Sequence, residues 1–535
     1  MGILAWAVMQ CITELFVDDE LGIAVGVAYW FTYSVGFSAL IASAAEYFNY
    51  WEVKPGVMAA VIYIVIPLIL IAFNTYDIGI YGWIEVATGT VKISFLVIVL
   101  FFLVAINARV WNTGSAYDDQ AAASWPVALM MCLSIAAFSY VGVEIIAASA
   151  VEARWRASSN PTQSSRTSAN GEKLHGQPQP TDASLNPAAP ANEEQKSISD
   201  TIIFTAAFVP FFVTIAYVLG GLLVSLRLEF KDCNLPKLAW INKSKDNINE
   251  NRCDISSSPF VIIAAGSDIK GLGTAFNFFI LFTVLACANT NLYVASRTLA
   301  GLTYRLTDDR RLSRWLRWFG RTDERKVPFR AMVFSAFAFA WVPFLQLETG
   351  SFDASYGIRS FIEILAQFCS TGVIIVWACL CLAYIRYYRC IRPSYVRDVL
   401  EHAGIHPRQY QQHGEKKYPY RSHWQPLVAY LALIFCLVIL VLFNGAFLWN
   451  QKESRGVQFL TSYLPVLVFL ALWAALKIVR GAKWSFVKLD EMEVKEIFEQ
   501  LKELRVATFE HNEEPPQPDH SLLQRTFWFV RAIRR

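Results

Sequence analysis

The sequence carries little charge for its length. Only 17% of its 535 residues are Asp, Glu, Lys or Arg, whereas 55% are hydrophobic. Soluble domains usually carry about 25% charged residues, so the composition argues against a soluble globular protein. The net charge of +3 says little by itself, because the placement of charges matters more than their total. We expect no nucleic-acid partner.

Histidine is also scarce, and the residue sets that enzymes use are missing. The 7 His lie mostly in polar loops, without an H-E-x-x-H motif or a Ser/His/Asp set. The 10 Cys are scattered, mostly within apolar stretches, without metal-ligand spacing. We therefore expect no catalytic residue, no metal and no cofactor, which argues against a membrane enzyme. A channel is disfavoured because no ring of charges or filter-like loop is evident.

Long apolar runs are what the chain has in abundance. A helix needs roughly 20 apolar residues to cross a bilayer. The sequence predicts an all-α, polytopic membrane protein of about eleven spans. The first run is short, at about 22 Å, and looks like the second half of a span. Residues 1–15 also lack the basic start and cleavage site of a signal peptide. The predicted runs are 1–15, 21–48, 57–73, 91–110, 126–151, 202–226, 259–299, 331–347, 361–385, 426–449 and 459–478.

Lys and Arg in the short loops predict the orientation of the spans. Residues 305–330 hold eight Arg and one Lys, so we expect them in the cytoplasm. The basic stretch 384–417 and the tail after residue 478 fall on the same side. The loop 227–258 is then external, where Cys233 and Cys253 could form a disulfide.

One apolar run, residues 126–151, carries polar groups at its centre. Glu144 lies there, and a carboxylate at mid-membrane costs at least about 2.5 kcal/mol. Gly142 beside it weakens a helix by up to about 1 kcal/mol relative to Ala. An interrupted helix frees peptide groups, which are tolerated only where they line a cavity. The pattern indicates a broken helix that offers carbonyls and a carboxylate to a polar solute. The alternative is a glutamate hydrogen-bonded inside a helix bundle for structural reasons.

Residues 136–152 read A-A-F-S-Y-V-G-V-E-I-I-A-A-S-A-V-E. This segment and several others resemble motifs of the fungal amino acid permeases, within the amino acid–polyamine–cation superfamily. Residues 136–152 resemble the F-S-[FY]-x-G-x-E…E-A signature of the sixth helix. Residues 16–29 resemble the F-V-D-x-x-L-G segment before the third helix, and 257–302 resemble the eighth helix, S-P-F-V-I…N-S-x-x-Y-x-x-S-R-x-L. Residues 375–386 resemble the I-x-W-x-C-I motif of the tenth, and 418–426 the L-P-Y…Q-P-Y start of the eleventh. Together these matches are far more specific than any one motif.

The resemblance implies two five-helix repeats of inverted topology, with two further helices and the substrate at the midplane. It implies proton-coupled uptake of L-amino acids across the fungal plasma membrane, with lipid around the protein. The backbone of Ser139, Tyr140, Val141 and Gly142 would help to bind the substrate α-amino group. Glu144 would stabilise that site and is a candidate proton carrier.

Two further residues are candidates by the same resemblance. Lys92 resembles the fifth-helix lysine that, in proton-coupled relatives, occupies the place of sodium elsewhere in the superfamily. The alternative for Lys92, one turn into its predicted span, is a snorkelling lysine at the interface. Asn289, with its neighbour Asn291, either hydrogen-bonds the substrate or fixes helix packing.

The family pattern is incomplete in this chain. The Gly-rich first helix has no counterpart, so we expect the first of twelve helices to be absent. The orientation predicted from the basic loops agrees, because it places residue 1 outside, whereas a family member with twelve helices starts inside. The third-helix Pro and Glu of the family fall near Ser38 and Leu40, which argues against Lys or Arg as substrate. These departures leave open a non-transporting relative, such as a nutrient sensor, or an inactive product of an incomplete gene.

The expected organisation of the chain has four parts. Residues 1–151 would hold the remnant of the first repeat and the start of the second, and 201–478 the remaining spans. Between them, residues 152–200 are predicted to be a disordered cytoplasmic insertion, because 157–192 are rich in Ser, Pro, Asn and Gln. An intron retained in the gene model would explain that composition as well. Residues 479–535 would form a cytoplasmic tail.

Overall fold

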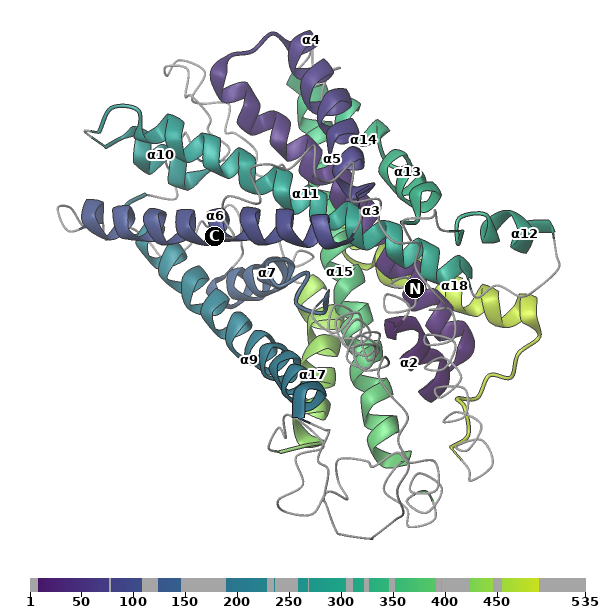
Figure 1. The fold of residues 1–535 in the computed structure, drawn as a ribbon. Helices are drawn as coiled ribbons and strands as arrows, with labels where there is room; N and C mark the ends of the chain where they lie inside the picture. The colour runs from purple at the N-terminus through teal and green to yellow at the C-terminus, as the bar shows by residue number, and fades with distance from the viewer. Residues whose placement is uncertain are drawn as a thin grey trace, which may run out of the picture.

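The fold is shown in Figure 1 as a computed structural model of the whole chain. All regular secondary structure in the described residues is helical. The described residues are 8–76, 78–107, 124–145, 189–228, 235, 258–267, 269–304, 311–321, 327–345, 352–390, 396, 424–445 and 455–489.

The α-helices follow one another along the chain and vary widely in length. They are α2 (Val8–Phe16), α3 (Asp19–Phe48), α4 (Pro55–Met58), α5 (Ile66–Asn74), α6 (Ile78–Asn107), α7 (Trp125–Phe138), α9 (Ala189–Ser225), α10 (Pro259–Ala265), α11 (Leu272–Tyr304), α12 (Arg311–Arg317), α13 (Phe329–Phe337), α14 (Trp341–Phe344), α15 (Phe352–Cys390), α17 (Leu427–Val438) and α18 (Arg455–Arg480). A 3-10 turn at Asn49–Trp51 and π-helical stretches at Ala59–Val65 and Ile439–Phe443 connect or extend some of them.

Within the described residues, 7 helices are long and apolar enough to cross a membrane. They are Asp19–Trp51, Pro55–Asn74, Tyr81–Asn107, Phe208–Ser225, Leu272–Tyr304, Leu365–Cys390 and Ser462–Arg480. Shorter apolar helices lie at Trp125–Ala137, Phe329–Phe344 and Leu427–Phe443. The chain is therefore an integral, polytopic, all-α membrane protein, and this part of the sequence prediction is confirmed.

Some boundaries differ from the sequence prediction. The run expected at 91–110 belongs to α6, which begins at Ile78. The run expected at 259–299 is divided into α10 and α11. Helix α9 begins at Ala189, inside the segment 152–200 that the composition indicates as a disordered insertion. Cys233, Cys253 and the tail beyond residue 489 lie outside the described residues.

Helix α3 lies at the centre of the molecule and contacts α2, α11 and α15 (Figure 1). Its start is fixed by Asp18, whose Oδ1 accepts hydrogen bonds from the backbone N–H of Glu20 at 3.0 Å and of Leu21 at 3.4 Å. Aspartate is a favoured residue at this position because its carboxylate satisfies N–H groups that lack helical partners. Small residues then allow neighbouring helices to approach α3 closely.

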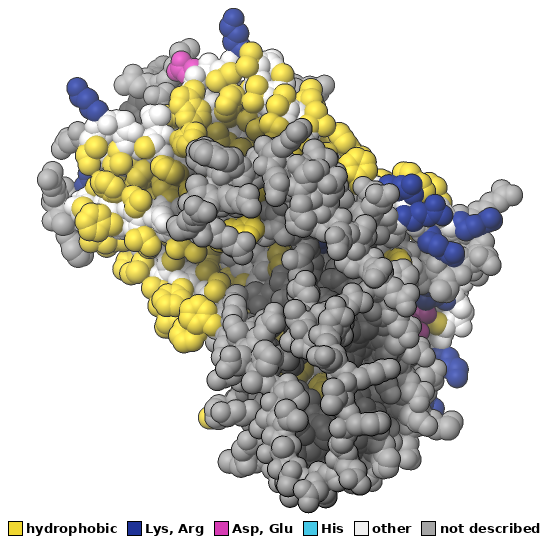
Figure 2. All heavy atoms as spheres, in the orientation of Figure 1, with side chains coloured by type: hydrophobic (Ala, Val, Ile, Leu, Met, Phe, Trp, Pro, Cys, Tyr) yellow, Lys and Arg dark blue, Asp and Glu magenta, His cyan; other side chains and the backbone are white. Residues whose placement is uncertain are grey.

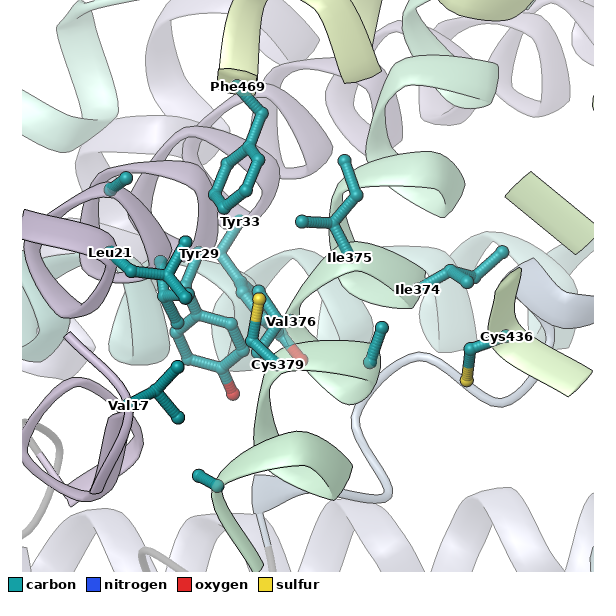
Figure 3. Packing of buried hydrophobic residues seen from close by; sticks show 14 of the residues in the cluster. Val17, Leu21, Tyr29, Tyr33, Ile374, Ile375, Val376, Cys379, Cys436 and Phe469 are labelled. Atoms are coloured by element: carbon teal, nitrogen blue, oxygen red, sulfur yellow. The ribbon is translucent and has the colours of Figure 1, made fainter. Parts of the chain in front are cut away.

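The largest buried cluster lies where α3, α15, α17 and α18 meet. Figure 3 shows Tyr29 and Tyr33 of α3 close to Val376 and Cys379 of α15, with Phe469 of α18 nearby. Val141 and Ile145, from the segment after α7, pack against this cluster. The cluster therefore holds that segment against the centre of the bundle.

The outer surface of α6 and α9 is apolar. Phe101 of α6 is 71% exposed and Val218 of α9 is 62% exposed. Figure 2 shows hydrophobic side chains spread over the side of the molecule where α6, α9 and α10 lie. Lys and Arg gather instead on the side of α12 and the end of α18. A continuous apolar surface of this kind suits contact with lipid.

The end of α18 is joined to the start of α3 by buried ions. Lys477 Nζ lies 2.6 Å from Asp18 Oδ2 and 3.2 Å from Glu20 Oε2. Residues 481–489 then run back along the same region, where Val487 N–H donates to the carbonyl of Val17 at 3.0 Å. We call residues 481–489 the C-terminal strap.

Candidate functional site at the helix break

The polypeptide leaves its helical path after Phe138, where α7 ends. Residues 139–144 form a series of turns, in which Ser139 N–H donates to Ala136 at 3.0 Å and Ile145 N–H donates to Gly142 at 3.1 Å. Both hydrogen bonds span three residues rather than the four of an α-helix. Gly142 has φ of +105°, which L side chains rarely adopt. The chain therefore breaks at the polar centre of the apolar run.

Glu144 closes this turn and points into the protein. Its side chain is only 9% exposed. Oε1 accepts hydrogen bonds from the hydroxyls of Tyr33 at 2.5 Å and Tyr29 at 3.4 Å. Oε2 accepts from Trp377 Nε1 at 3.2 Å and from the backbone N–H of Gly142 at 3.2 Å. Both oxygens of this buried carboxylate are thus hydrogen-bonded, as burial of a charged group requires.

Three of the four donors to Glu144 come from helices that are distant in sequence. Tyr29 and Tyr33 are one turn apart on α3, so both hydroxyls reach the same oxygen. Their rings pack edge to face with centroids 4.8 Å apart. Trp377 comes from α15. The broken segment is therefore held between the two central helices by a single carboxylate.

The two oxygens of Glu144 differ in their capacity to carry a proton. Indole and backbone N–H groups can only donate hydrogen bonds, so Oε2 must accept from Trp377 and Gly142. Tyrosine hydroxyls can donate or accept. A proton on Glu144 would consequently sit on Oε1, with the Tyr33 hydroxyl rotating to accept it.

The start of the turn is held from the other side, by α9. Tyr217 donates its hydroxyl to the Ser139 carbonyl at 3.1 Å. The Tyr140 hydroxyl lies 2.9 Å from Thr214 Oγ1, and the rings of Tyr140 and Tyr217 pack edge to face at 5.9 Å. The turn thus lies between α9 and the α3–α15 pair.

Lys92 is not near the end of its helix. Because α6 begins at Ile78, Lys92 lies about 21 Å along the axis, and not one turn into the span as the apolar run alone indicates. Its Nζ is 3.5 Å from Glu85 Oε1, and the same oxygen accepts a hydrogen bond from Thr290 of α11 at 3.1 Å. The structure therefore gives Lys92 an acidic partner within the membrane.

Asn289 is placed differently from the other candidates. Its Oδ1 accepts a hydrogen bond from Asn74 Nδ2 at 2.7 Å, which joins α11 to α5, and its side chain is 5% exposed. These contacts are those of a packing residue. The structure places Ser139, Tyr140, Gly142 and Glu144 in one turn, and Val141 of the same turn packs against the buried cluster. Asn289 lies in a separate contact.

Sequence reasoning missed the partners of the candidate residues, among them Tyr33, Tyr217, Trp377 and Glu85. Trp377 had a signal, because it lies in the I-x-W-x-C motif of residues 375–386. Glu85 also had one, since opposite charges seven residues apart in an apolar span share a helix face. Tyr33 and Tyr217 had none, because their contacts depend on how distant helices pack.

Comparison with known proteins agrees with this architecture. A family model described as amino acid permease matches residues 12–162 and 188–488. The chain belongs to the amino acid permease family. Its relatives are permeases rather than enzymes, and several come from fungi.

The relatives differ in the substrates that their names state. A lysine/arginine permease of Candida albicans is 23% identical over 473 residues, which cover 86% of this chain and 66% of the relative. A dicarboxylic amino acid permease of Saccharomyces cerevisiae is 23% identical over 541 residues, which cover 94% of this chain and 74% of the relative. A proline-specific permease of Emericella nidulans is 21% identical over 565 residues, which cover 99% of this chain and 85% of the relative. The chain spans about two thirds of the length of the first of these.

Proposed function

We propose that this chain transports L-amino acids across a fungal plasma membrane by coupling their uptake to protons. The observation that carries the proposal is the break at residues 139–144, closed by a buried glutamate with four hydrogen-bond donors. A helix broken within the membrane supplies peptide groups that can replace water around a charged solute. Membership of the amino acid permease family supports an amino acid as that solute.

The α-amino group of the substrate would bind the backbone of the turn. Carbonyls there are the acceptors that an ammonium group needs. Glu144 would act mainly through its electrostatic field and by fixing the shape of the turn, because its own oxygens already accept hydrogen bonds from protein donors. Protonation at Oε1 would weaken the Tyr33 contact and so change how tightly the turn is held to α3. This would connect proton binding to substrate binding.

A transport assay in vesicles tests the role of Glu144. Purified protein is reconstituted into liposomes, and uptake of labelled amino acids is measured with and without an inward proton gradient. We expect Glu144→Gln to abolish the stimulation by the gradient, because the amide cannot carry a proton and presents an N–H₂ group to at least one donor. Glu52→Gln, at an exposed residue, is the matched control.

Two results would count against this proposal. Unchanged pH dependence in Glu144→Gln would remove Glu144 from proton coupling. Failure of the wild-type protein to accumulate any amino acid, with insertion into the liposomes verified, would favour the alternative of a non-transporting relative such as a nutrient sensor.

A further inference from the structure

A second polar cluster lies between α6 and α11, apart from Glu144. Glu85 Oε1 accepts a hydrogen bond from Thr290 at 3.1 Å and lies 3.5 Å from Lys92 Nζ. The side chains of Lys92 and Glu85 are 21% and 34% exposed. The pair is therefore partly buried, neither sealed in the core nor fully open.

The pair faces the protein and not the lipid. Tyr81, Val99 and Leu103 of α6 are buried, and helical spacing places Glu85 and Lys92 on their side of the helix. The opposite side carries exposed apolar side chains. These are Trp83, Val86, Ile93, Val97 and Phe101. An ion pair on the inward side of a membrane helix is a functional feature by default, because each charge is costly to bury.

The pair is also connected to the helix break. Helix α6, which carries the pair, contacts both α11 and α9, and Tyr217 lies on α9. Tyr217 in turn donates to the Ser139 carbonyl. A side chain projecting from a substrate bound at the turn towards α11 would meet this pair.

We propose that Glu85 is a specificity-determining residue, which cancels the charge of Lys92 and so sets the side-chain charge that the permease accepts. This inference rests on the proposed transport function. With both residues present, the pair has no net charge, and neutral side chains are favoured. Removal of either charge leaves the other to attract or repel the substrate side chain, and this attraction is strong inside a membrane protein.

The aromatic and titratable side chains around the pair are not replaced in any of the variants. Tyr81 of α6 and Tyr293 of α11 stack at 4.2 Å, and the guanidinium of Arg297 lies 3.5 Å from the Tyr293 ring. Among the described residues, Cys287 is a further titratable neighbour. Because every variant keeps these groups, a difference between variants in the ratio of aspartate to lysine uptake reports the pair alone.

The test compares uptake of lysine, leucine and aspartate by four variants in liposomes. Glu85→Gln should improve kcat/KM for aspartate over lysine by about tenfold or more, which corresponds to about 1.4 kcal/mol. Lys92→Met should shift the same ratio in the opposite direction. The double variant Glu85→Gln/Lys92→Met and the exchanged pair Glu85→Lys/Lys92→Glu should both return to the wild-type ratio. Thr90→Val, whose hydroxyl donates to the Val86 carbonyl of the same helix, is the control.

A merely structural pair would give a different pattern. Equal loss for all three amino acids in Glu85→Gln, with the ratio unchanged, would overturn the inference. Glu85→Gln and Lys92→Met are predicted to shift the ratio in opposite directions, so either one still tests the inference if the other does not fold. If the wild-type protein accumulates no amino acid at all, the proposed function fails. Affinities of the purified protein for the same labelled amino acids then decide whether the pair selects charge.

Discussion

Gly142 combines an unusual backbone conformation with open space around it. An ideal Cβ at this position would meet only Ile145 Cδ1, at 3.6 Å, which is ordinary contact. The obstacle to any other residue is therefore the φ of +105° and not a clash. A non-glycine residue held in a sparsely populated region costs about 1–3 kcal/mol. This residue makes the tight turn possible.

Replacement of Gly142 by Ala should therefore destabilise the protein by about 1–3 kcal/mol and weaken substrate binding. Gly221→Ala is the matched control, because Gly221 is exposed on α9 with nothing within 4 Å of an added Cβ. There the change should stabilise by about 0.5–1 kcal/mol, since alanine favours a helix. Thermal unfolding of the purified proteins measures both effects, and equal melting temperatures would contradict the reasoning.

The two tyrosines on Glu144 allow a second prediction at this scale. Tyr33 donates at 2.5 Å and Tyr29 at 3.4 Å, to the same oxygen. Tyr33→Phe should cost about 1.5–3 kcal/mol, as for a hydrogen bond to a charged group, and Tyr29→Phe should cost clearly less. The pH profile of uptake should change in Tyr33→Phe and stay near wild type in Tyr29→Phe. Identical profiles for the two variants would show that the hydroxyls are not distinguished.

Helices α3 and α15 approach each other closely at Gly372. A Cβ on Gly372 of α15 would lie 2.3 Å from Thr32 Oγ1 of α3. That distance is shorter than Cβ atoms show, so the glycine sets the spacing of the helices that carry Tyr33 and Trp377. Overpacking of a close contact of this kind usually costs about 1–3 kcal/mol.

Gly372→Ala should consequently lower the melting temperature and move Trp377 away from Glu144. Adding Thr32→Ala should restore much of the loss, because it removes the hydroxyl that the new methyl group meets. Thermal unfolding and transport of the single and double variants give the coupling between the two positions. Additive losses would show that the two residues do not meet.

How well the sequence predicts each feature depends on how far apart in the sequence the residues that form it lie. Glu144 and Gly142 are found because a carboxylate and a glycine in an apolar run are visible locally. The start of α6 is misplaced, because Gly82, Glu85 and Gly89 lower the hydropathy of its first turns. The bond between Tyr33 and Glu144 joins residues 111 apart, and no local pattern encodes which distant side chains will meet.

In the whole molecule, a buried ion cluster joins the two ends of the described chain. Lys477 is 3% exposed and lies between Asp18 and Glu20, which are 2% and 8% exposed. Arg480 lies 4.0 Å from Glu20 but is 44% exposed. The two cations therefore differ in burial while facing the same carboxylate.

Lys477→Met should destabilise the protein by about 3–5 kcal/mol, because it removes the buried cation that Asp18 and Glu20 share. Arg480→Gln is the matched control and should cost about 0–1 kcal/mol, as for a surface pair. Thermal unfolding in detergent compares them directly. Equal stability of the two variants would mean that burial does not decide the strength of this cluster.

The C-terminal strap has a practical consequence for anyone who labels this protein. Arg386 of α15 donates to the carbonyl of Val487, whose N–H donates to the carbonyl of Val17, so the strap is attached to the bundle at two points. A fluorescent domain inserted between residues 481 and 489 would pull these attachments apart, whereas one joined after residue 489 would leave them in place. A pair of such fusions, compared by yield and monodispersity, would locate the last residue that the folded bundle needs.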